Sequence, residues 1–111
     1  MSPVPVELEI DPDGKVTAFG EGAAAQLGLT GAKAGQHTLV TLLDPEDRAA
    51  AERLLAATFG GVPQRGTLRF RRQTGSSRWD VVSLPVVADG RVTAARWLLW
   101  PVEEPAGAER S

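Results

Sequence analysis

The sequence has no cysteine, which removes several kinds of chemistry at once. Disulfides, thiolate catalysis, zinc–thiolate sites and covalent thiol adducts all need a cysteine sulfur. It also lacks an apolar run of about 20 residues, the length that a membrane-spanning helix needs. The first ten residues carry neither the basic region nor the long apolar core of a signal peptide. We therefore expect a cytoplasmic protein with no membrane contact.

Charge of one sign is not in excess either. The net charge is −2, whereas a general nucleic-acid binder normally carries a basic excess, so we expect no nucleic-acid partner. The 111 residues, 42% of them hydrophobic, fit one globular domain with a single core. We assign residues 1–6 to a flexible N-terminal segment, residues 7–102 to the domain and residues 103–111 to a disordered tail rich in polar residues.

The first half of the domain has the pattern of a hairpin followed by helices. Val6–Ile10 alternates apolar and acidic residues, Asp11–Gly14 is a strong turn sequence, and Lys15–Phe19 continues as a second strand. Residues 21–29 form a short helical stretch, and after a loop residues 37–43 give one or two further turns. This order predicts a β-hairpin packed beside a helical block.

The clearest single element is a helix over Pro45–Thr58. Asp44 is a strong N-cap residue, Asp47 suits the positive end of the helix dipole, and Gly60-Gly61 can end the helix in a left-handed conformation. One face is apolar at helical spacing, through Ala51, Leu54, Leu55 and Phe59. The helix is therefore built to cover another element.

Three strands follow, over residues 66–72, 78–87 and 91–100. Turns at residues 73–77 and 88–90 join them. Strands on both sides of a helical block indicate an α+β fold, an antiparallel sheet with helices packed on one face.

Five segments resemble a Per-ARNT-Sim (PAS) domain: "DPDGKVTAF", "GAAAQLGL", "LLDPEDR", "LRFRRQTGSSRWDVV" and "VVADGRV". They occur in the family's order and cover roughly Leu8 to Trp100. The resemblance implies a five-stranded antiparallel sheet curved around helices, with a cavity between the sheet and the long helix. It also implies a sensory or protein-interaction module, often dimeric and often attached to an effector. The sequence itself carries no effector, so the module is either stand-alone or part of a longer protein.

The sequence departs from the family's pattern in two places. Gly20 stands where the family commonly has an asparagine, and Pro101, Val102 and Glu103 stand where it commonly has an Asp-Ile-Thr junction to the effector.

We expect neither a cofactor nor a metal. His37 is the one candidate haem ligand, but it precedes the long helix, whereas haem-binding PAS domains generally take their ligand from that helix or just after it. The cysteine-dependent photochemistry of the light-oxygen-voltage and yellow-chromophore subfamilies is excluded. Non-covalent flavin would find only the amides of Gln26 and Gln36 in the helical block.

We also expect no enzyme and no catalytic residue. Capping and the helix dipole already explain Asp44, Glu46 and Asp47, and no Ser/His/Asp set, phosphate loop or metal-spaced cluster occurs. The arginines of the sheet half could bind a phosphate-bearing partner, but on strands such residues more often form a solvated face that discourages edge pairing. They are Arg65, Arg69, Arg71, Arg72, Arg78 and Arg96.

Both faces of the last two strands are apolar, which is unusual for a sheet with one face in water. The helices cover one face, so the other needs a second subunit, another partner or the N-terminal segment. We therefore predict a sensory or interaction module that forms a homodimer through Val82, Leu84, Leu98 and Trp100.

The alternative is a sensor that holds a small apolar or flavin-like ligand between the sheet and the long helix. The residues expected to line that core or cavity are Phe19, Leu27, Leu39, Leu43, Leu55, Phe59, Phe70 and Trp79.

Overall fold

The computed structural model describes residues 5–20, 26–27, 37–72 and 75–102. Five strands form one antiparallel sheet in the order β2-β1-β5-β4-β3. The strands are β1 (Val6–Ile10), β2 (Val16–Phe19), β3 (Gln64–Arg72), β4 (Gly75–Ala88) and β5 (Arg91–Pro101). The α+β fold and the five-stranded antiparallel sheet predicted from the sequence are therefore confirmed.

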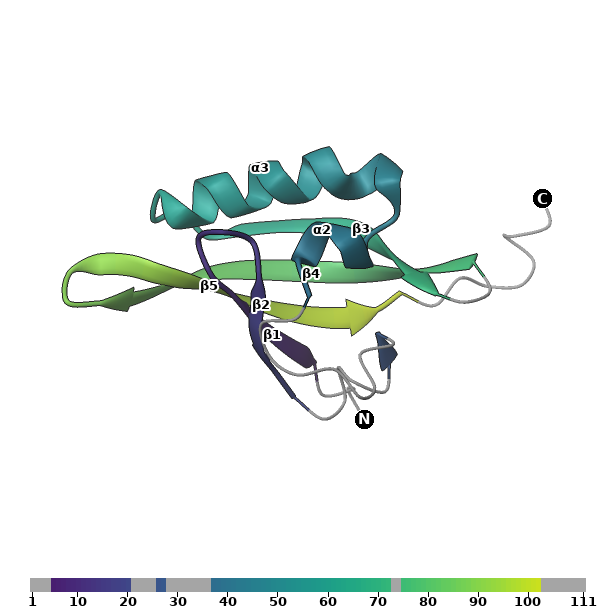
Figure 1. Cartoon of the computed structure of the whole chain (residues 1–111), viewed down its shortest axis with the longest axis horizontal. Helices are drawn as coiled ribbons and strands as arrows, with labels where there is room; N and C mark the ends of the chain where they lie inside the picture. Colours follow the sequence, from purple (N-terminus) through teal and green to yellow (C-terminus); the bar gives the residue numbers. More distant parts are fainter. Residues whose placement is uncertain (1–4, 21–25, 28–36, 73–74, 103–111) are drawn as a thin grey trace.

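The helices lie on one face of this sheet (Figure 1). They are α2 (Leu39–Leu42), the 3₁₀ turn η1 (Pro45–Asp47) and α3 (Arg48–Phe59). The long helix begins with a 3₁₀ turn rather than as the α-helix that we predicted from Pro45. The reason is local: the Asp47 amide donates to the Asp44 carbonyl three residues back, and the Glu46 amide donates to the Asp44 side chain. Asp44 is therefore an N-cap residue, as predicted, but it caps the 3₁₀ turn η1 rather than an α-helix.

The predicted turns are confirmed between β1 and β2 and between β4 and β5. Between β1 and β2, the Asp11 side chain accepts from the amides of Asp13 and Lys15, both at 2.9 Å. Between β4 and β5, Asp89 and Gly90 both have positive φ, as a two-residue type I′ turn requires. The β4–β5 hairpin projects past the end of α3 (Figure 1).

Two strands begin earlier than predicted. β3 begins at Gln64 rather than at residue 66, and β4 begins at Gly75, inside the turn expected over residues 73–77, because Gly75 and Ser76 pair with Arg72 and Arg71. β1 has the predicted bounds, and Val6, the last residue of the segment that we expected to be flexible, pairs with Leu99 and is buried. The tail over residues 103–111 and most of the helical stretch over 21–29 lie outside the described residues.

The core lies between α3 and the inner face of the sheet. Leu8, Phe70 and Trp97 are among its largest fully buried side chains, and α3 contributes Ala51 and Leu55. Alternate residues of β4 and β5 point inward, as their period of two requires. One layer of helices on one face of the sheet leaves the opposite face, which we call the outer face, without a cover from α3.

The segment before α3 also covers part of the edge strand β3. The Asp44 amide donates to the Arg69 carbonyl at 2.9 Å, and the Arg69 amide donates to the Asp47 carboxylate at 2.7 Å. Leu43 bridges to Phe70 beside them. The backbone carbonyl and amide of Arg69, which could otherwise pair with a strand of another molecule, are therefore hydrogen-bonded at this point of the edge.

Candidate functional site

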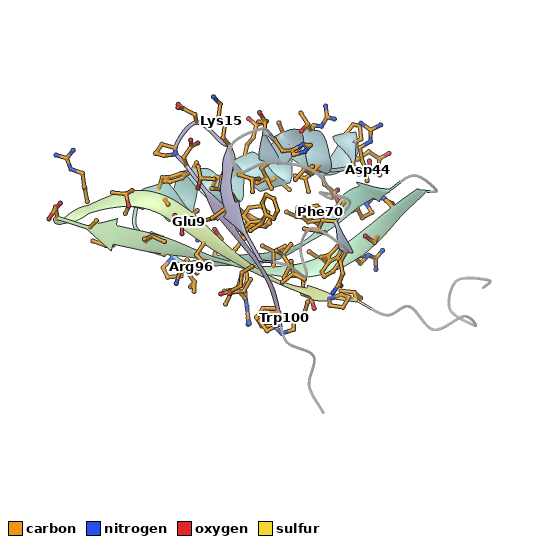
Figure 2. The ribbon with its side chains drawn as sticks, turned by 60° about the horizontal axis from the view of Figure 1, so that its bottom comes forward. Glu9, Lys15, Asp44, Phe70, Arg96 and Trp100 are labelled. Carbon is orange, nitrogen blue, oxygen red and sulfur yellow. The ribbon has the colours of Figure 1, made fainter. Side chains whose placement is uncertain are left out.

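The outer face carries an apolar patch at its centre. Val82 and Leu84 project from β4, and Leu98 and Trp100 project from the neighbouring strand β5. All four side chains are half-buried, whereas Trp79, Val81, Trp97 and Leu99 on the inner face are buried. Trp100 lies on the side of the sheet away from α3 (Figure 2). The faces predicted for these residues from alternation are confirmed, whereas their role in a dimer stays a prediction. We call these four residues the outer patch.

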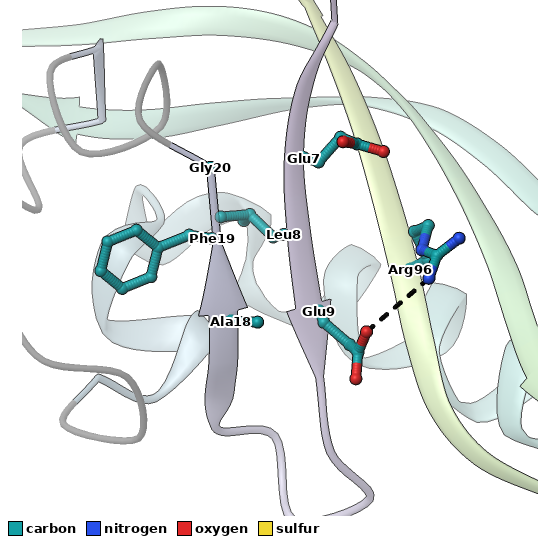
Figure 3. A pocket seen from close by; sticks show the side chains of 7 residues that line it. All are labelled: Glu7, Leu8, Glu9, Ala18, Phe19, Gly20 and Arg96. Carbon is teal, nitrogen blue, oxygen red and sulfur yellow. Dashed lines mark ion pairs between the residues drawn. The ribbon is translucent and has the colours of Figure 1, made fainter.

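Charges of opposite sign flank the outer patch. On the β1 side, Glu7 and Glu9 project outward, and Glu9 forms an ion pair of 3.9 Å with Arg96 (Figure 3). On the β3 side, Arg65 is exposed, and Thr67 donates a hydrogen bond of 2.9 Å to Asp80. Glu7 and Glu9 on β1 and Arg65 on β3 therefore lie at opposite edges of the outer patch, whereas Arg96 on β5 and Asp80 on β4 lie within it, opposite Leu84 and Trp100.

Two shallow hollows lie on this face. One, of about 340 Å³, is lined by Glu7, Glu9, Ala18, Phe19 and Arg96 among others (Figure 3). The other, of about 510 Å³, lies beside Trp100 over β3 and β4. Both hollows are open to solvent, and side chains of another molecule can pack into them.

The eight residues predicted to line the core or cavity do come together. Six are buried in the single hydrophobic cluster, and Phe19 and Phe59 are partly buried against it. Phe70 and Trp79 contact each other edge to face, with ring centroids 6.5 Å apart. That these residues enclose a ligand stays a prediction.

The core also contains polar atoms that the sequence interpretation missed. The hydroxyl oxygens of Thr58 on α3 and Ser83 on β4 lie 2.7 Å apart and are buried. Ser83 is opposite Trp97 on β5, and the buried indole nitrogen of Trp97 has no hydrogen-bond partner within the described part of the chain. The spacing of Thr58 from Ala51 and Leu55 was the available signal, since it places Thr58 on the apolar helix face.

The acidic residues before α3 are engaged with one arginine. Arg69 donates to Glu46 at 2.9 Å and to Asp47 at 3.3 Å. The hydrogen bond from the Arg69 guanidinium holds the pKa of the Asp47 carboxyl below its ordinary value, and the Arg69 amide adds to this effect. The Asp-Pro-Glu-Asp-Arg sequence therefore joins the start of α3 to strand β3.

The remaining sequence candidates are His37, Gln26 and Gln36. His37 is half-buried before α2, where its carbonyl accepts from the Val16 amide at 2.9 Å. Gln26 is exposed, and Gln36 lies outside the described residues. In the part of the chain that the structure describes, no group of three or more His, Cys, Asp or Glu residues could hold a metal ion. Nor is any helix there long and apolar enough to span a membrane.

Four arginines of the sheet half lie at outward-facing positions near the β3 edge of the sheet. Arg65, Arg69 and Arg71 alternate along β3, and Arg78 on β4 is directly opposite Arg69. Arg69 is bound to the start of α3, and Arg96 on β5 pairs with Glu9. That the arginines form a solvated face rather than a phosphate site stays a prediction.

No protein-family model and no curated protein matches the chain. Solved structures do match. The PAS domain of a protein from Colwellia psychrerythraea is 14% identical with a TM-score of 0.75, over 88% of this chain and 86% of that one. A domain of a putative light and redox sensing histidine kinase from Haloarcula marismortui is 15% identical with a TM-score of 0.73, over 89% and 90%. The N-terminal domain of a diguanylate cyclase with PAS/PAC sensor from Marinobacter aquaeolei is 20% identical with a TM-score of 0.72, over 87% and 94%. The chain thus has the PAS fold, as its resemblance predicted.

Proposed function

We propose that this chain is a sensory and protein-interaction module that forms a homodimer through the outer face of its sheet. The observation that carries the proposal is the outer patch: four large apolar side chains on adjacent strands, only half-buried, on the face that α3 does not cover. The fold adds support, since structures that share it include domains of a sensing histidine kinase and of a diguanylate cyclase. The cytoplasmic location and the lack of catalysis and of a nucleic-acid partner stay predictions from the sequence.

A second copy is the occupant that suits this face best. A stable interface buries roughly 800 Å² on each partner, which an apolar centre with polar surroundings can supply on a sheet of this size. Val82 and Leu98 would lie at the centre of such an interface, with Leu84 and Trp100 on either side of them along the strands. Large side chains such as Trp100 contribute most of the binding energy in an interface. Charged groups on both sides of the patch then form its rim.

The test is to place a charge in the patch. Leu84→Arg and Trp100→Arg should each convert the dimer to a folded monomer, because an arginine at the contact cannot be desolvated without a partner. Light scattering coupled to size exclusion measures the mass, and circular dichroism measures the fold. Val87→Arg is the matched control: Val87 is 62% exposed at the β4–β5 hairpin, outside the patch, so the dimer should persist. A wild-type protein that stays monomeric up to millimolar concentration would overturn the proposal.

A second candidate function is a sensor with a small ligand in the core. The observation that favours it is the buried Trp97 indole N–H, which has no hydrogen-bond partner among the residues that the structure describes. A buried donor without an acceptor is costly, and a ligand oxygen would satisfy it. Native mass spectrometry of the purified protein tests this directly. A retained small molecule that is lost in Trp97→Phe supports a ligand, and a bare protein mass opposes it.

A further inference from the structure

On the outer face, one row of directly opposite residues has an order of charged and apolar side chains that is complementary to the same row in a second copy. Glu7 on β1 is opposite Leu98 on β5, Leu98 is opposite Val82 on β4, and Val82 is opposite Arg65 on β3. The row therefore contains an acid, two apolar residues and a base, on four neighbouring strands. Within the residues that the structure describes, neither Glu7 nor Arg65 forms an ion pair or a side-chain hydrogen bond, and both are exposed.

The row has its centre between β5 and β4. Strands lie roughly 4.8 Å apart, so β1 and β3 are at equal distances on either side of that centre. A two-fold axis that passes through the centre, parallel to the strands, turns a second copy face to face with the first. It places β1 of one copy over β3 of the other, and β5 over β4.

This operation leaves each residue in its own row. Glu7 of each copy then faces Arg65 of the other, and Leu98 of each copy faces Val82 of the other. A two-fold axis perpendicular to the strands gives the opposite result, because it places Glu7 over Glu7 and Arg65 over Arg65. Like charges in contact are unfavourable, so the charge order distinguishes the two arrangements.

We propose that the homodimer has its two-fold axis parallel to β4 and β5, with two symmetric Glu7–Arg65 pairs on either side of the Leu98–Val82 contacts. This inference rests on the proposed dimer and specifies its geometry. Such an axis keeps the strands of the two sheets nearly aligned, within the angle of about 30° that stacked sheets adopt. The pairs fix the arrangement of the copies, and the outer patch supplies the apolar burial.

The experiment uses charge reversal at both ends of the row. Glu7→Arg alone faces Arg65 of a second copy, and Arg65→Glu alone faces Glu7, so each variant should raise the dimer dissociation constant about tenfold or more, through two repulsive pairs. When the two variants are mixed, the arginine introduced at position 7 of one copy faces the glutamate introduced at position 65 of the other. The second pair of that heterodimer is the unchanged Glu7–Arg65 pair, so it should form with near wild-type affinity.

The double variant should also dimerise, because both pairs are restored with exchanged signs. Sedimentation equilibrium of the two single variants, their mixture and the double variant measures all four dissociation constants.

Matched controls lie on the opposite face. Glu52 and Arg53 are exposed on α3, so Glu52→Arg and Arg53→Glu make the same charge changes away from the interface and should leave the dissociation constant unchanged. Should Glu7→Arg or Arg65→Glu fail to fold by circular dichroism, Glu7→Gln and Arg65→Gln should still weaken the dimer, and by less.

The outcomes separate this inference from the proposed function. A wild-type dimer that Trp100→Arg dissociates, but that the Glu7 and Arg65 variants leave unchanged, overturns the axis and retains the outer-face dimer. The axis is also overturned if the single variants dimerise weakly and their mixture dimerises no more tightly than either variant alone. A monomeric wild type overturns both. Weakening of the single variants supports the axis, since an arrangement that places Glu7 over Glu7 and Arg65 over Arg65 only exchanges one like-charged pair for another in each of them. A mixture that dimerises more tightly than the wild type overturns the axis, because that other arrangement gives two new pairs of opposite charge in the mixture.

Discussion

The hydroxyl oxygens of Thr58 and Ser83 lie 2.7 Å apart and join α3 to β4 inside the core. The Thr58 hydroxyl donates to the Leu54 carbonyl at 2.8 Å, so its single proton is engaged and Ser83 donates to it. Apolar contacts are not directional, so a helix that packs on a sheet through them alone can shift or rotate at a small cost in free energy. A directional bond between two buried groups specifies one position of α3.

The first prediction concerns this bond. Thr58→Val keeps the side-chain shape but leaves the Ser83 hydroxyl without a partner, so it should lower the free energy of unfolding by about 1–3 kcal/mol. Ser83→Ala should be milder, because Thr58 keeps its bond to Leu54. In the double variant both hydroxyls are gone, and its loss should be smaller than the sum of the single losses. Urea unfolding measures all three, and simple additivity would show that the two groups are not coupled.

The second prediction concerns pH. Asp47 has a pKa below its ordinary value of 3.8 in the folded state, because Arg69 bonds to its carboxylate. Its contribution to stability is therefore present above the unfolded pKa and is lost as the pH falls through the lower folded pKa. Asp47→Asn should lower the free energy of unfolding at pH 7 by about 1 kcal/mol, a value reduced for solvent screening. The difference from wild type should shrink as the pH falls below about 4.

Glu46→Gln is the control for Asp47. Glu46 also pairs with Arg69, but its side chain is 76% exposed, so its loss should change stability little at any pH. Urea midpoints of the three proteins across the acidic range provide the comparison. Equal effects of the two substitutions would contradict the role given to the bond between Asp47 and the Arg69 amide.

The third prediction compares the two faces of the sheet. Phe70 is fully buried between α3 and the sheet, so Phe70→Ala should lower the free energy of unfolding by about 3–5 kcal/mol. Trp100 is half-buried on the outer face, so Trp100→Ala should have a much smaller effect at concentrations where the protein is monomeric. Its effect should grow with protein concentration, since dimerisation stabilises the wild type. Equal losses that do not vary with concentration would mean that Trp100 belongs to the core.

The sequence alone predicts the order and faces of the strands and the turns before β2 and β5, because these follow from local patterns, whereas the starts of β3 and β4 differ from the predicted ones. Alternation assigns Leu98 and Trp100 to the face opposite Trp97, and that assignment is confirmed. An Asp-Gly pair predicts its turn through the positive φ that it tolerates. These features depend on residues a few positions apart, which is the range over which sequence patterns are informative.

Cross-strand register depends on a feature that the sequence does not reveal. A β-bulge between Val86 and Val87 inserts one residue into β5. Pairs counted outward from the Asp89-Gly90 turn without the bulge would place Val82 opposite Trp97 rather than Leu98. The ordered row from Glu7 to Arg65 is therefore visible only in the structure. The buried polar atoms of Thr58 and Trp97 are a similar case, because whether a polar group finds a partner depends on packing.

The last prediction compares the two buried tryptophans of the inner face. Trp79 is 2% exposed and its indole nitrogen donates to the Ser77 hydroxyl at 2.8 Å. Trp97 is fully buried, and its indole nitrogen has no partner in the segments that the structure describes. Substitution by phenylalanine removes a similar volume at each position. Trp79→Phe also removes a hydrogen bond, whereas Trp97→Phe removes an unsatisfied donor, whose burial costs about 1–3 kcal/mol. Trp79→Phe should therefore lower the free energy of unfolding more than Trp97→Phe does. Urea unfolding of the two variants measures the difference. The reverse order would mean that the Trp97 indole N–H has an acceptor in solution. Native mass spectrometry would then show whether that acceptor is a retained ligand.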